Sequence, residues 1–292
     1  MIDIGNQLNI CYETFGSYEH EPILLLMGTG LQGILWPDDF CNDLAQHHFY
    51  VIRYDYRDTG LSSCIDYEKK PYTLMDLVDD AFRLLDKLKI KKVHIVGLSM
   101  GGHLAQLMAI YHPKRLLTST LIMSTPHHMV FLNAVLAGKN TPNTSLSKPY
   151  NELIEFFSKP FHDVEDREKS IDYSLATWKL FNGQKADFDE ASWRILLTKQ
   201  YERTINPYAR INHRKACLAS SEDRTPLLKK IQVSTLIIHG LDDPLFPVDH
   251  GKALATAIPN SKLLIIENMG HALNRLFQNQ IVNAMAAHMK IF

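Results

Sequence analysis

The chain has 292 residues, and its 31 lysine and arginine residues nearly balance its 32 aspartate and glutamate residues, which gives a formal net charge of −1. A balance so close to neutral argues against a protein built mainly to bind nucleic acid or an anionic membrane surface. Apolar residues make up 46% of the chain, and a chain of this length buries enough surface to fold without disulfide bonds.

The sequence shows no pattern of a membrane or secreted protein. The longest uninterrupted apolar run, residues 23–27, is far shorter than the ~20 residues of a membrane span. The first residues lack the basic and then apolar pattern of a secretory signal. The four cysteines are widely spaced and form no C-x-x-C pair, so we expect free thiols in a reducing compartment: Cys11, Cys41, Cys64 and Cys217. These features favour a soluble, globular, cytoplasmic protein.

Short strand-like runs alternate with longer helical patterns in the first 125 residues or so. Strands are predicted at 8–15, 23–27, 49–54, 93–96 and 116–123, and helices at 37–47, 73–88 and 99–111. In 73–88 the apolar residues recur at the spacing of one helix face. This alternation favours parallel βαβ units, with helices on both faces of a sheet.

The pattern changes over residues 125–225, where helical patterns continue and strand-like runs almost disappear. Alternation then returns, with predicted strands at 233–239 and 263–267 and predicted helices at 250–257 and 275–290. The simplest architecture is one α/β domain, residues 1–124 and 226–292, interrupted by a helical cap at 125–225.

Residues 93–102 carry the clearest chemical motif, since a predicted strand runs into G-x-S-x-G and then into a predicted helix. This context is that of a nucleophile elbow, a sharp turn that holds the serine, here Ser99, in a strained conformation at the carboxyl edge of the sheet. Gly97 and Gly101 provide room, because a β-carbon at either position would collide with a neighbouring strand or helix.

A serine nucleophile needs a base and an acid that orients the base, and in hydrolases with this elbow both follow the serine in the chain. Asp243 lies in the loop after the predicted strand 233–239, and His271 lies in the loop after 263–267. Both loops lie at the carboxyl ends of strands, the edge where open α/β sheets place their sites. We therefore predict Ser99 as nucleophile, His271 as general base and then acid, and Asp243 as the orienting acid.

Alternatives remain open for two of these residues. His239 ends a strand and is a second candidate base, while Asp242 competes with Asp243 for the role of the acid. The pair His127 and His128 has no partner at ligand spacing, so we expect solvated loop residues and no metal site.

An oxyanion hole requires two backbone donors near the serine. One is the N–H of Met100 at the start of the helix, and the second is expected from the loop after the strand 23–27. The N–H of Thr29 is our candidate, with Gly28 allowing close approach; the alternative is an ordinary glycine-rich turn.

At this point the residues resemble the α/β-hydrolase superfamily over essentially the whole chain. Several stretches are similar to its aclacinomycin methylesterase branch: LLMG at 25–28, WPDDF at 36–40, RYDYRDTG at 53–60, WRIL at 193–196, HGK at 250–252 and GHAL at 270–273. The resemblance implies a serine hydrolase with a helical cap over Ser99. We expect the acidic and basic residues of 53–60 to hold a loop and not to perform chemistry.

Aromatic residues in and near the cap are candidates for an apolar substrate pocket: Trp36, Phe131, Trp178, Trp193 and Phe246. The leading hypothesis is a hydrolase without cofactor or metal that cleaves a carboxylic ester, such as a methyl ester, of a small apolar molecule. Alternatives are an enol-lactone or C–C bond hydrolase or a perhydrolase on the same triad, and a non-catalytic receptor on the same fold. We expect a monomer or homodimer that binds a small-molecule ester as its substrate and does not bind nucleic acid.

Overall fold

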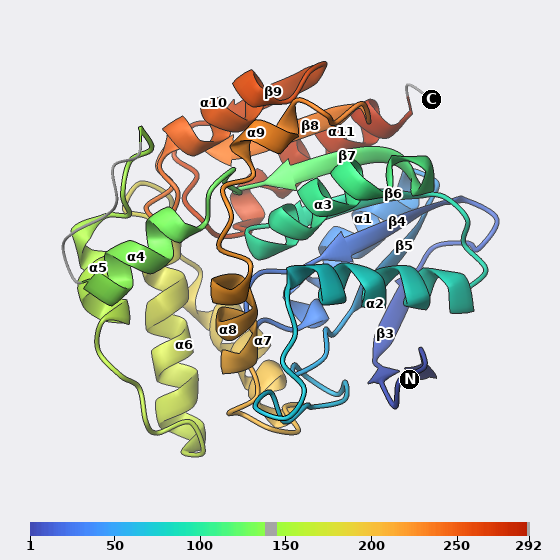
Figure 1. Cartoon of the computed structure of the whole chain (residues 1–292). Coiled ribbons are helices and arrows are strands. Elements are labelled where there is room, and N and C mark those ends of the chain that lie inside the picture. Colours follow the sequence, from blue (N-terminus) through green and yellow to red (C-terminus); the bar gives the residue numbers. More distant parts are fainter. Residues whose placement is uncertain (138–144, 291–292) are drawn as a thin grey trace.

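A seven-stranded sheet forms the centre of the computed structural model, which describes residues 1–137 and 145–290 (Figure 1). Its strands are β3 (Tyr12–Phe15), β4 (Glu21–Leu26), β5 (Phe49–Tyr54), β6 (Val93–Leu98), β7 (Leu116–Ile122), β8 (Thr235–Gly240) and β9 (Ser261–Ile266). Their order across the sheet is β3-β5-β4-β6-β7-β8-β9, and only the edge strand β3 runs antiparallel to its neighbour. The predicted α/β architecture is confirmed.

Helices cover both faces of the sheet, as the alternating pattern predicted. On one face lie α2 (Leu74–Lys87), α3 (Met100–Tyr111) and α10 (Val248–Ala257), and on the other lie α1 (Asp38–Gln46) and α11 (Gln278–Met289) (Figure 1). Every residue of β6 and β8 is buried, which explains why these strands are nearly continuous apolar runs. In α2, the helix face built on Leu74, Leu77 and Val78 faces the core.

The short elements near the N-terminus differ from the prediction. The run 8–15 was expected to be one strand, but it breaks at Cys11: β2 (Asn9–Ile10) pairs with β1 (Ile2–Asp3), and β3 joins the main sheet. The break occurs because the Cys11 N–H donates to the Ser62 hydroxyl and its carbonyl accepts from Asp55, so the chain bonds to a loop there. The described residues also form four short helices: η1 (Gly33–Leu35), η2 (Pro113–Arg115), η3 (Arg275–Phe277) and α9 (Thr225–Leu228).

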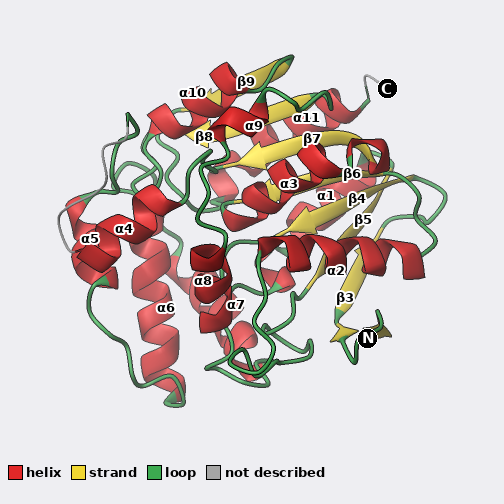
Figure 2. Cartoon of the chain, in the orientation of Figure 1, coloured by secondary structure: helices red, strands yellow, loops and turns green. Residues whose placement is uncertain are grey.

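Residues 125–225, called the cap segment below, lie between β7 and the C-terminal strands. They contain α4 (Met129–Ala137), α5 (Asn151–Phe157), α6 (Arg167–Asn182), α7 (Glu190–Glu202) and α8 (Ile211–Ala219). Figure 2 shows these helices gathered beyond the carboxyl ends of the parallel strands. No strand occurs in the described part of the cap segment, and none of the described helices is long and apolar enough to cross a membrane.

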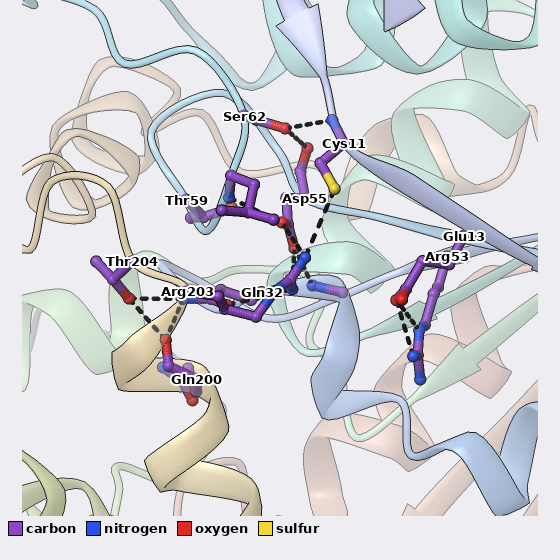
Figure 3. A network of polar contacts seen from close by, with 12 residues as sticks. Cys11, Glu13, Gln32, Arg53, Asp55, Thr59, Ser62, Gln200, Arg203 and Thr204 are labelled. Atoms are coloured by element: carbon purple, nitrogen blue, oxygen red, sulfur yellow. Dashed lines mark hydrogen bonds and ion pairs between the residues drawn. The ribbon is translucent and has the colours of Figure 1, made fainter. Parts of the chain in front are cut away.

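A polar network joins α7 to the loop after β5 (Figure 3). The Arg203 guanidinium forms an ion pair with Asp55 at 3.0 Å, and the Asp55 carboxylate also accepts the N–H groups of Gly33 and Leu61. Gln32 donates to the Gln200 carbonyl at 2.9 Å. These contacts agree with the structural role expected for residues 53–60, because they tie that loop to the cap segment.

Candidate active site

Ser99 lies at the tight turn between β6 and α3. Its backbone angles are φ 54° and ψ −114°, a conformation that residues with a β-carbon rarely adopt, and its N–H donates to the Ile122 carbonyl at 3.0 Å. A β-carbon on Gly97 would overlap the Gly101 carbonyl, and one on Gly101 would overlap the Leu26 carbonyl. The two glycines therefore permit the sharp turn, as the sequence predicted.

Asp243 and His271 meet at the same edge of the sheet. Asp243 follows β8 and His271 follows β9, and His271 Nδ1 lies 2.7 Å from Asp243 Oδ2. The other carboxylate oxygen, Oδ1, accepts the N–H groups of Leu245 and Phe246 at 2.9 and 2.8 Å. The acid is thus held from both sides, and the imidazole is held by the acid.

The charge state of Asp243 follows from its surroundings. Burial raises the pKa of Asp243, but the adjacent His271 and the hydrogen bonds to the carboxylate outweigh burial and lower the pKa below its usual value. An ionised Asp243 requires a proton on Nδ1 of His271, which leaves Nε2 of the neutral ring as an acceptor. Nε2 is buried without a hydrogen-bond partner among the described residues, and both His271 and Ser99 line the same cavity.

The two alternative residues lie elsewhere. Asp242 forms an ion pair with Lys185 at 2.8 Å, so the structure brings Asp243 and not Asp242 to the imidazole of His271. His239 is completely buried behind the acid, where its Nε2 donates to the Phe246 carbonyl at 2.7 Å. It is not among the residues that line the cavity.

The loop after β4 passes beside Ser99. A β-carbon built on Gly28 would lie 3.6 Å from Ser99 Cβ, and Gly28 and Thr29 both line the cavity. Met100 is the first residue of α3, so its N–H belongs to the N-terminus of that helix. That the N–H groups of Met100 and Thr29 form the oxyanion hole stays a prediction.

The cavity above Ser99 has a volume of about 290 Å³ and lies between the sheet edge and the cap segment. Three of the five predicted aromatic residues line it, namely Phe131, Trp178 and Phe246. Leu98, Leu132, Val135 and Leu245 add to a predominantly apolar wall. A cavity of this size and lining suits a small molecule with an apolar body.

The prediction that Trp36 and Trp193 line the pocket is wrong. Trp36 is fully buried beside Phe40 in the core, with 5.2 Å between the ring centroids. Trp193 stacks on Trp178 at 4.3 Å and is not itself a lining residue, so it supports the pocket wall without forming it.

Two histidines of the cavity were not recognised from the sequence. His128, expected to be solvated, is buried: its Nε2 donates to the Cys217 carbonyl and its Nδ1 accepts from Arg224. It stacks on His103, with 5.0 Å between ring centroids. His103 follows Ser99 by one helical turn in α3, a spacing that indicates a residue on the same side of the helix.

Comparison with known proteins agrees with this fold. Residues 21–274 match the family described as alpha/beta hydrolase fold. A rhodomycin D methylesterase from Streptomyces peucetius is 32% identical over 97% of this chain and 96% of its own length. Among solved structures, an enol-lactonase from Burkholderia xenovorans LB400 has a TM-score of 0.73 and 21% identity, with 98% of each chain covered. A meta-cleavage product hydrolase from Pseudomonas fluorescens IP01 has a TM-score of 0.73 and 19% identity, with 97% and 95% covered. At these identities the solved structures support the fold alone.

Proposed function

Because this chain belongs to the α/β hydrolase fold family, we propose that it hydrolyses a carboxylic ester, with Ser99 as nucleophile, His271 as general base and Asp243 as orienting acid. The observation that carries the proposal is the 2.7 Å contact between Asp243 and His271, which leaves Nε2 of the imidazole without a partner beside the cavity that Ser99 lines. Such a pair has the arrangement that activates a serine.

The reaction proceeds in two stages. His271 Nε2 takes the proton as Ser99 Oγ attacks the ester carbonyl, and the backbone N–H groups of Met100 and Thr29 stabilise the negative oxygen, with Gly28 giving access. The imidazolium then protonates the leaving alcohol, which departs and leaves an acyl-serine. Water, deprotonated by His271, hydrolyses that ester and restores Ser99.

The apolar cavity supports a substrate of modest size. The relative from Streptomyces peucetius is named a methylesterase, and methanol is a leaving group small enough to leave a cavity of this size. We therefore propose a methyl ester as the scissile bond, residues 125–225 as the cap that encloses it, and the cytoplasm as the place of action.

A fluorophosphonate probe tests the nucleophile directly, since it phosphonylates only an activated serine. We expect mass mapping to find the label on Ser99 in the wild type and no label in Ser99→Ala. The matched control is Ser174→Ala, which removes another serine hydroxyl of the cavity and should still be labelled. Absence of labelling in a wild-type protein that melts cooperatively contradicts the proposal and favours a non-catalytic receptor.

A further inference from the structure

The charges that line the cavity are all of one sign. Among the described residues that line it, Arg210 and Arg214 are the only ones with a permanent charge, and there is no aspartate, glutamate or lysine. The ester chemistry proposed above needs no cation at this wall, so the two guanidinium groups call for another explanation.

Both arginines lie at the start of α8, close to the proposed reaction centre. Arg210 immediately precedes α8, and Arg214 lies within the helix, one turn after Arg210. The two therefore lie on the same side of α8. A β-carbon built on Gly30 would lie 3.2 Å from the Arg210 carbonyl oxygen, so the helix begins against the loop that passes Ser99.

Both arginines act on one further residue of the cavity. Tyr173 of α6 also lines the cavity. Burial raises the pKa of its phenol, and the charges of Arg210 and Arg214 both oppose that rise. Both positive charges therefore act on the same phenol, and all three side chains line the same cavity.

Neither arginine has a protein partner among the described residues. Within residues 1–137 and 145–290, neither Arg210 nor Arg214 forms an ion pair within 4.0 Å or a side-chain hydrogen bond, whereas the buried Arg57 and Arg203 bind Asp80 and Asp55. Arg210 also borders a small neighbouring cavity that Asp58 lines. The Asp58 carboxylate is already bonded to the Ile65 N–H, the Tyr72 hydroxyl and the Asn212 amide.

The surroundings of Arg210 disfavour its positive charge. Burial lowers the pKa of Arg210, which reflects the loss of water around its charge, although a guanidinium stays protonated at neutral pH. Arg210 also lies at the N-terminus of α8, where the helix dipole repels a positive charge. An anionic group bound between the two arginines would offset both effects.

We propose that the natural substrate is a half-ester that carries a free carboxylate, and that Arg210 and Arg214 bind this carboxylate while the ester group lies at Ser99. This assignment rests on the proposed ester hydrolysis. A carboxylate matches the planar fork of a guanidinium, which donates two parallel hydrogen bonds to it. The apolar side chains that line the same cavity then contact the hydrocarbon that joins the two ends of the substrate.

A matched pair of substrates tests the proposal, namely monomethyl adipate, which carries the carboxylate, and dimethyl adipate, which does not. We expect the wild type to have a kcat/KM at least 10-fold higher for the monoester. In the variant Arg210→Gln/Arg214→Gln the ratio between the two substrates should fall about 10- to 100-fold, chiefly through KM, as removal of charge-assisted hydrogen bonds implies. The control Arg194→Gln removes an exposed arginine paired with Asp172 and should leave the ratio unchanged.

Binding to Ser99→Ala separates this proposal from the proposed function. The probes are the monoamide of adipic acid and its neutral diamide, observed by ligand NMR. Binding of the monoamide that depends on both arginines supports the carboxylate site even if no ester is hydrolysed. Hydrolysis of both adipates without a preference for the monoester, or a double variant in which the ratio is retained, overturns the carboxylate site and leaves ester hydrolysis standing.

Discussion

Asp242 and Asp243 are adjacent in the chain and have different surroundings. Asp243 is fully buried and accepts hydrogen bonds from His271, Leu245 and Phe246, whereas Asp242 forms its ion pair with the exposed Lys185. An ion pair to an exposed lysine contributes little to stability, while the contact to the imidazole fixes which ring nitrogen carries the proton.

For this reason Asp243→Asn should lower kcat on an ester substrate by about 10⁴-fold, because an amide donates to Nδ1 and favours the wrong tautomer of His271. The amide oxygen can still accept the N–H groups of Leu245 and Phe246, so we expect the variant to fold. The matched control, Asp242→Asn, should retain kcat within about 3-fold. The reverse order of the two variants in steady-state kinetics would assign the acid to Asp242.

Site residues that lie in or next to a recognisable local sequence pattern could be predicted from the sequence. Site residues that reach the cavity only through packing between distant parts of the chain could not. Ser99 lies in a motif whose strand and helix are contiguous with it, and Asp243 and His271 each follow a buried strand. Arg210 and Arg214 line the cavity because α8 packs against the loop containing Gly30, a contact between distant parts of the chain. Nothing near Trp193 in the sequence indicates that Trp178 lies between it and the cavity.

At the scale of elements, the end of α6 is fastened to the loop that carries His271. The His271 N–H donates to the Phe181 carbonyl at 2.6 Å, and the Phe181 ring meets the imidazole edge-on with 5.3 Å between centroids. A β-carbon on Gly270 would overlap the carbonyl oxygens of Phe181 and Asn182. The close approach of helix and loop therefore requires glycine at position 270.

Gly270→Ala should accordingly weaken both the fold and catalysis. We expect a loss of roughly 1–3 kcal/mol in the free energy of unfolding, the range for overpacking, and a lower kcat because the loop with His271 must move. Urea unfolding and ester kinetics measure the two effects. In the control Gly5→Ala a β-carbon meets nothing within 4 Å, so only the local strain at φ +88° remains and kcat should not change. Equal kcat in both variants would contradict the argument.

The elements of the sheet were easier to predict than those of the cap segment. Strands such as β6 and β8 are buried on both faces and so consist of apolar runs with sharp ends. In α6 the buried apolar residues form only a narrow row of Ile171, Leu175 and Trp178, and polar and apolar residues are mixed over the rest of the helix. Such a row predicts a helix but gives no bounds and no packing partner.

Across the whole molecule, burial keeps several histidines neutral. It lowers the pKa of His103, His213 and His239, and it lowers the pKa of His128 to about 3. An unfolded histidine has a pKa of about 6.5, so below that pH the unfolded chain binds protons that the folded chain excludes. The contribution of these histidines to stability is therefore complete above pH 6.5 and is lost as the pH falls toward 3.

The free energy of unfolding, measured in urea, should thus fall between pH 7 and pH 5 by up to about 1.4 kcal/mol per pH unit for each proton taken up on unfolding. His128→Gln should reduce this slope, even though it lowers stability overall. The control His162→Gln replaces an exposed histidine and should leave the slope unchanged. A free energy of unfolding that is constant over this range would contradict the prediction.

Phe181 belongs to the cap segment in sequence, yet its carbonyl oxygen accepts the backbone N–H of the residue that carries the proposed base. Replacing the cap segment with that of a relative, in order to change the substrate range, therefore also replaces the residue whose carbonyl holds the His271 loop. Crossover points that retain residues 180–183 keep this bond unchanged, whereas with crossover points at the ends of the cap segment the grafted backbone must place a carbonyl at the same position. A substitution within residues 180–183 can therefore alter both the substrate pocket and the position of His271, so substrate range and kcat are expected to change together there.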